Sequence, residues 1–83
     1  SNAHKVINGI IRVFYKDYSN NIWVGSNVGL SYFNIQKGSW QYITFPNSAS
    51  PFVGSIVEDQ AHQIWVSTNI GIYRIENNIA VHQ

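Results

Sequence analysis

Few side chains in this sequence have the types and spacing that metal binding needs. The three histidines, His4, His62 and His82, lie near one end, in the middle and near the other end of 83 residues. None has a second ligand at the spacing of a zinc site. The sequence therefore predicts neither a metal site nor a cofactor.

The acidic residues are the only other candidates for chemistry, since a pair of carboxylates could hydrolyse a glycosidic bond. However, Asp17 and Asp59 occupy the same position of an internal repeat, which indicates that both have a structural role in a turn. An Asp side chain can accept a hydrogen bond from the backbone two residues later. Segment 17–21 also lacks the alternating ligands and the closing Glu of a calcium loop. None of the four acids is therefore predicted to be catalytic, and the segment is predicted not to be an enzyme. The four acids are Asp17, Glu58, Asp59 and Glu76.

The strongest pattern is a sequence motif that occurs twice, at 17–30 and 59–72, with an offset of 42 residues throughout. A fixed period of about 40 residues is typical of β-propeller blades and of some helical arrays. In such architectures each unit buries its apolar faces mainly against its neighbours. The repeated glycines are predicted to have positive φ at the start of a hairpin. Asp17, Trp23 and Gly29 recur as Asp59, Trp65 and Gly71.

The composition is compatible with a small globular unit. Apolar residues make up 45% of the chain, and charged residues only 11%, with a net charge of +1. This balance gives no sign of nucleic-acid binding or of a charged contact with a membrane. No apolar run reaches the roughly 18 residues that a membrane helix needs. The absence of cysteine fits an oxidising compartment and the cytosol equally well.

Eight short segments rich in β-branched and aromatic residues are separated by clusters of Asn, Gly, Ser, Asp and Pro, as in a meander of strands. No stretch keeps apolar residues at helical spacing between capping signals, so no helix is predicted. The longest link contains Pro46 and Pro51, which exclude it from a central strand. The predicted strands are 10–16, 22–26, 30–34, 39–45, 53–58, 64–68, 72–76 and 79–82.

The strands are apolar on both faces. Ile64 and Val66 point to one side of their strand and Trp65 to the other, and 22–24 repeats this arrangement. A sheet with one face in water would alternate apolar and polar residues. The sequence therefore predicts an all-β fold in which two four-stranded antiparallel blades of a β-propeller stack face to face.

The repeated sequence motif resembles the two-component regulator propeller repeat, whose pattern is Asp-x-x-Gly-Asn-(Ile/Leu)-Trp-(Ile/Val)-Gly-Thr-x-x-Gly-Leu. The resemblance covers nearly all of the chain, as two repeats. Repeats of this family build the extracytoplasmic sensor regions of hybrid two-component system histidine kinases, and many of these systems control polysaccharide-use loci. The resemblance implies a propeller segment that takes part in signal sensing and signal transduction, with the kinase outside the segment.

The chain departs from the family pattern in three places. The turn glycine is Asn20 in the first copy and His62 in the second, and both residue types tolerate left-handed backbone geometry. Gly25 becomes Ser67, and the final Leu becomes Ile72. These changes affect the blade and leave the implied function in place.

The predicted ligand-binding residues lie at one end of the blades. Loops of a four-stranded meander alternate between two ends, so the 26–29 and 68–71 hairpins emerge beside the 46–51 link. By analogy with other propellers, which generally bind at the end that carries the links, we expect an oligosaccharide to contact this end and to be shared with other blades. The polar residues predicted to contact it are Asn27, Asn47, Ser48 and Asn69.

Trp40 is a further candidate, because its aromatic ring could stack on a sugar. The 42-residue offset pairs Trp40 with His82, so it has no repeat partner, whereas Trp23 and Trp65 repeat with the fold and are expected to pack between blades. Core packing of Trp40 stays open as the alternative.

These observations divide the chain into four parts. Residues 1–3 resemble the remnant of a cleaved purification tag and are excluded from the fold; blade one is 4–45, the link 46–52 and blade two 53–83. The expected location is the periplasmic or extracytoplasmic part of a membrane-anchored parent, with no contact between this segment and membrane or nucleic acid. The alternative function is an architectural or protein-interaction propeller segment without a small ligand.

Two blades leave two outer faces that a larger propeller would cover. A large exposed apolar surface is rarely tolerated in a monomer, and open strand edges invite pairing. We therefore expect the chain to self-associate through outer faces or edges. Three or four copies could close a ring of six or eight blades.

Overall fold

The computed structural model describes residues 2–46, 48 and 50–83, which form one short helix and eight strands. The elements are α1 (Asn2–Ile7), β1 (Ile11–Lys16), β2 (Ile22–Ser26), β3 (Gly29–Asn34), β4 (Ser39–Tyr42), β5 (Val53–Glu58), β6 (Ile64–Thr68), β7 (Gly71–Glu76) and β8 (Ile79–His82). The strands form two four-stranded antiparallel sheets, β1-β2-β3-β4 and β5-β6-β7-β8. The predicted all-β fold of two blade-like sheets is confirmed.

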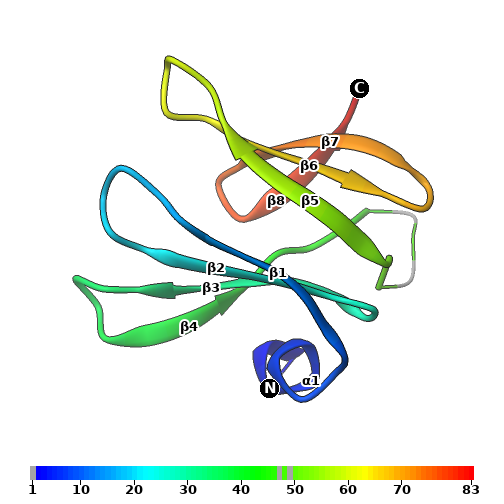
Figure 1. Ribbon diagram of the computed structural model, residues 1–83, viewed down its shortest axis with the longest axis horizontal. Coiled ribbons are helices and arrows are strands. Elements are labelled where there is room, and N and C mark those ends of the chain that lie inside the picture. Colours follow the sequence, from blue (N-terminus) through cyan, green and yellow to red (C-terminus); the bar gives the residue numbers. More distant parts are fainter. Residues whose placement is uncertain (1, 47, 49) are drawn as a thin grey trace.

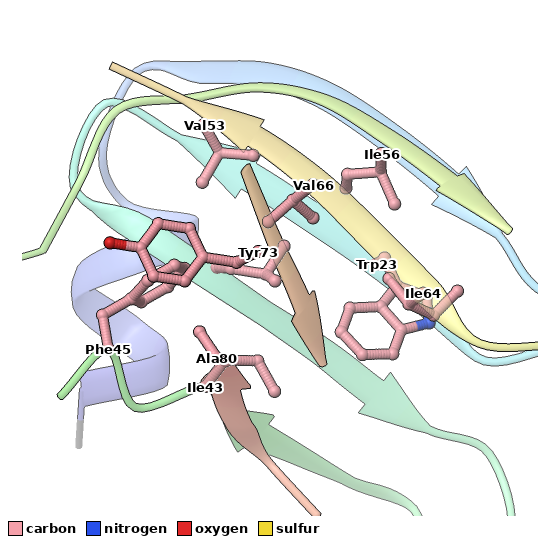
Figure 2. Packing of buried hydrophobic residues seen from close by; sticks show 10 residues of the cluster. Trp23, Ile43, Phe45, Val53, Ile56, Ile64, Val66, Tyr73 and Ala80 are labelled. Carbon is pink, nitrogen blue, oxygen red and sulfur yellow. The ribbon is translucent and has the colours of Figure 1, made fainter. Parts of the chain in front are cut away.

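The two sheets stack face to face in the order expected for consecutive blades (Figure 1). Ten buried residues from both sheets and from the segment that follows β4 form one apolar cluster between them. Trp23 of the first sheet lies beside Ile64 of the second in this layer (Figure 2). The cluster comprises Trp23, Leu30, Ile43, Phe45, Val53, Ile56, Ile64, Val66, Tyr73 and Ala80.

Gly25 sets how closely the sheets approach. A Cβ atom built on Gly25 would lie 2.6 Å from Val53 Cγ1 of the second sheet and 2.8 Å from Val13 Cγ1. Real Cβ contacts are never this short. The repeat equivalent, Ser67, lies on the outer face of its sheet and has room for a hydroxyl, which bonds the Ser55 hydroxyl at 2.6 Å.

Helix α1 was not predicted, and the expectation of a chain without helix is wrong. Its side chains Ala3 and Val6 are buried against the side of the first sheet that faces away from the second (Figure 1). Residues 2 and 3 therefore belong to a helix of the described fold, although they were expected to lie outside it. A six-residue helix is too short to show a helical apolar pattern, and it is stabilised by packing on the sheet.

The segment after β4 also differs from the prediction. The strand expected over 39–45 ends at Tyr42, after which Ile43 and Phe45 are buried in the core. Between them, Thr44 bridges to β8: its N–H donates to the Asn78 carbonyl (3.0 Å), and the Ala80 N–H donates to its carbonyl (2.8 Å). Part of the outer edge of β8 is therefore paired within the chain.

The turn between β7 and β8 is shorter than its counterpart in the first sheet. It contains only Asn77 and Asn78, which have φ values of 51° and 64°, as a tight hairpin turn requires. The corresponding connection between β3 and β4 spans 35–38. This difference shifts the repeat: Phe33 pairs with Trp40, and the equivalent Ile75 pairs with Ala80. The structural counterpart of Trp40 is therefore Ala80, and pairing it with His82 by a constant offset was wrong.

Candidate functional site

A groove with a volume of about 560 Å³ lies between the two sheets, at the end that carries the Asp17 and Asp59 turns. Its floor is apolar, formed by Ile64 and Ile75 of the second sheet and Trp23 of the first. The ring of Tyr32 stacks on Trp23 with centroids 4.4 Å apart and an angle of 23°. The groove thus combines aromatic surface with aliphatic side chains.

Asn78 joins the two sheets at the wall of this groove. Its Oδ1 accepts a hydrogen bond from the Tyr32 hydroxyl at 3.0 Å, and its Nδ2 contacts Gln41 Oε1 at 3.5 Å. Asn78 is the second residue of the tight turn between β7 and β8, so this turn of the second sheet reaches the first sheet. The phenol of Tyr32 is thereby fixed in the groove.

The rim presents amide groups that the protein itself does not use. The exposed side chains of Gln63 and Asn77 make no hydrogen bond within the described part of the chain, and both border the groove. Each amide has donors and an acceptor to offer to a ligand. The described lining contains no lysine or arginine. This arrangement suits a neutral polar ligand with an apolar face.

The Asp17 carboxylate, also at the groove, is fully engaged by its own turn. Its Oδ1 accepts hydrogen bonds from the Ser19 and Asn21 N–H groups at 2.9 Å, and its Oδ2 accepts one from Trp23 Nε1 at 2.8 Å. Its geometry therefore confirms the predicted structural role.

The Asp59 turn repeats these contacts with the same distances. The Trp65 indole donates to Asp59 Oδ2 at 2.8 Å, and Ala61 and Gln63 N–H groups donate to Oδ1. The Trp65 hydrogen bond and then the Gln63 N–H are the largest of the contacts that lower the pKa of Asp59 below its usual value. His62 has positive φ in this turn, as Asn20 has in the first, and the predicted tolerance of both residues is confirmed.

A second set of contacts joins the sheets beside the groove, centred on Glu58 of β5. Its Oε1 accepts hydrogen bonds from the Tyr15 hydroxyl (3.0 Å) and the Tyr18 N–H (3.1 Å) of the first sheet. Its Oε2 lies 3.3 Å from His62 Nδ1, and the His62 ring stacks on Tyr18 with centroids 4.1 Å apart. The hydrogen bond to Glu58 is the main cause that raises the pKa of Tyr15.

No family model, curated protein or solved structure matches the chain. Within 2–46, 48 and 50–83, no three His, Asp or Glu side chains gather as a metal site would require. Over the same residues there is no helix of the length and hydropathy needed to cross a membrane.

The predicted ligand residues do not come together in the groove. Asn27 Oδ1 accepts the Ile10 N–H at 2.8 Å, and Asn69 Oδ1 accepts the equivalent Phe52 N–H at 2.9 Å. Both side chains therefore fix the backbone directly before the first strand of a sheet. Their shared position in the repeat was the signal that pointed to this structural role.

Two further predicted residues, Ser48 and Trp40, do not line the groove. Ser48 borders a second hollow of about 680 Å³ beside β8, with Pro46, Ile70 and His82. Asn47 lies outside the described residues. Trp40 is partly buried on the outer face of the first sheet, in edge-to-face contact with Phe33 at 5.5 Å, and therefore lies away from both hollows.

The sequence did not point to Gln63, Asn77 and Asn78 as site residues. The Asn77-Asn78 pair between two β-prone segments is a recognisable signal for a two-residue turn. The contact of that turn with Tyr32, however, depends on how the two sheets stack, which no local pattern specifies.

Proposed function

We propose that this chain is a two-blade segment of the extracytoplasmic β-propeller sensor region of a hybrid two-component system histidine kinase. The observation that carries the proposal is the repeated Asp–Trp turn, whose residues resemble the propeller repeat of these sensors. The blade-like sheets and their face-to-face stacking support it. The segment itself is proposed to bind a signal and to pass that event to a kinase outside it.

The proposed signal is a neutral saccharide that binds in the groove between the sheets. Sugar rings combine an apolar face with hydroxyl groups, which matches the apolar floor and the free amides of Gln63 and Asn77. The described lining has no lysine or arginine, and its one histidine, His62, already contacts Glu58, which disfavours sulfated sugars and uronic acids. This location differs from the link end predicted from the sequence.

The first experiment is a glycan-array screen of the sensor region that carries this chain, followed by calorimetric titration of each neutral sugar that binds. Asn77→Gly removes the amide and keeps a residue that accepts positive φ. The loss of one hydrogen bond is expected to weaken binding by about tenfold. Asn20→Gly is the matched control, because it makes the same change at φ 68° outside the groove lining.

Binding of only anionic sugars, or equal effects of the two substitutions, would contradict the assignment of the groove. If no sugar binds to the sensor region, the architectural or protein-interaction alternative is favoured instead.

A further inference from the structure

The outer face of the second sheet is apolar and open. We call it the Trp65 face; it consists of the side chains that point away from the first sheet. Val57 and Ile72 are 55% and 54% exposed, Ile79 is 45% exposed, and Trp65 and Val81 are partly buried. The repeat-equivalent face of the first sheet, which carries Trp23, is covered by the second sheet. The internal interface thus shows that this kind of face accepts another β-sheet.

Head-to-tail stacking of copies is blocked at the receiving face. In that arrangement the outer face of the first sheet in one copy would cover the Trp65 face of the next. Helix α1 already occupies part of that outer face, with Ala3 and Val6 buried against it. A second sheet cannot reach β2, β3 and β4, which the helix contacts, without displacing it.

The side chains at the centre of such a contact are also too large. Within the molecule, Gly25 faces Val53 with no room for a Cβ. In a head-to-tail contact Ser67 would take the place of Gly25, and Ile11 would take the place of Val53. Both side chains are larger than those they replace at the point where the sheets approach most closely. Head-to-tail contact at the internal spacing would therefore produce a clash between Ser67 and Ile11.

The edge of the second sheet is a poor alternative. Thr44 pairs with Asn78 and Ala80 along the edge of β8, and so it covers backbone groups that another strand would need. Pairing of copies along this part of the β8 edge would have to break these hydrogen bonds.

The Trp65 face is compatible with a copy of itself. Its two charged side chains, Arg74 and Glu76, have opposite signs and form an ion pair with an N–O distance of 3.1 Å. The face therefore presents no net charge to an identical face, and its apolar residues supply the attraction. Two identical patches related by a two-fold axis form a closed contact, which is the commonest symmetry of homo-oligomers.

We propose that the Trp65 face binds the Trp65 face of a second copy of this chain, which gives a two-fold symmetric dimer of packed sheets. Aligned face-to-face packing about 10 Å apart is the usual geometry of two such sheets. A single four-stranded face is small for a stable interface, so the dimer is expected to be weak. The inference concerns the 83-residue chain alone, because in the larger propeller proposed above a following blade would cover the Trp65 face; it is independent of the proposed ligand.

Sedimentation equilibrium of the chain from about 10 µM to about 1 mM tests the proposal over the range of weak affinities. The wild type is expected to change from monomer to dimer. Ile72→Glu and Val57→Glu place charge on the Trp65 face and are expected to remain monomeric. Phe14→Glu is the matched control, since Phe14 is 64% exposed on the outer face of the first sheet, and it is expected to dimerise like the wild type. Circular dichroism establishes that each variant is folded.

A wild type that stays monomeric at about 1 mM, or a mass of three or four copies, would overturn the proposal. Loss of association in Phe14→Glu but not in Ile72→Glu would do the same. Because the chain has no cysteine, a mixture of the Ile11→Cys and Ser67→Cys variants gives a further test. A disulfide between the two variants would show head-to-tail contact, whereas the two-fold dimer predicts that none forms.

Discussion

Trp23 and Trp65 show how the same residue in the same local structure has different surroundings. Each indole donates a 2.8 Å hydrogen bond to the Asp that opens its turn. Trp23 is only 5% exposed because the second sheet covers it, whereas Trp65 is partly buried on an open face. The predicted equivalence of the two positions is confirmed, and the predicted burial holds fully only for Trp23.

This difference predicts unequal effects on stability. Trp23→Ala should lower the free energy of unfolding by about 3–5 kcal/mol, because it opens a cavity in the core. Trp65→Ala should cost clearly less, since part of that ring is already in water. Both variants lose the equivalent hydrogen bond to Asp, so the difference reports the packing of each ring, which for Trp23 includes the stacking on Tyr32. Chemical denaturation measures both values, and equal losses would contradict the role assigned to the sheet interface.

At the scale of strands and turns, the sequence specified most of the fold. Short segments rich in β-branched and aromatic residues, together with the Asp, Gly and Asn of the turns, were sufficient to place eight strands within a few residues of their observed bounds. Helix α1 could not be predicted, because six residues carry too little pattern and the helix depends on packing against β2, β3 and β4. The site was missed for a similar reason: Tyr32 and Asn78 lie 46 residues apart and meet only after the sheets stack.

The close approach of the sheets at Gly25 gives a test at this scale. Gly25→Ala should destabilise the fold by about 1–3 kcal/mol, because the new Cβ overlaps Val53 and Val13 and the sheets must separate. Gly54→Ala in β5 is the matched control: its new Cβ would have no neighbour nearer than 3.6 Å. Thermal and chemical unfolding of both variants measure the effects. A Gly25→Ala variant as stable as the control would show that the sheets have room to adjust.

In the whole molecule, the two sheets are joined by polar contacts as well as by the apolar core. Tyr15 and Glu58 form one contact, Tyr32 and Asn78 another, and Thr44 pairs with β8. Each joins residues far apart in the sequence and depends on the relative position of the sheets. Apolar packing alone would hold the two sheets together in more than one arrangement. The polar contacts therefore select one relative position of the sheets.

The Tyr15–Glu58 contact makes the association of the sheets sensitive to alkaline pH. The hydrogen bond to Glu58 raises the pKa of Tyr15 above 10.0, and burial and the charges of Glu58 and Asp17 act in the same direction. Because the folded state has the higher pKa, the contribution of this contact is complete below the unfolded pKa and is lost as pH rises through the folded pKa. Melting temperatures above pH 10 should therefore fall more steeply for the wild type than for Tyr15→Phe, which has no proton to lose. Tyr18→Phe, which retains the Tyr15–Glu58 bond, should keep the wild-type slope. Parallel curves for the wild type and Tyr15→Phe would show that ionisation of Tyr15 does not affect the stability of the fold.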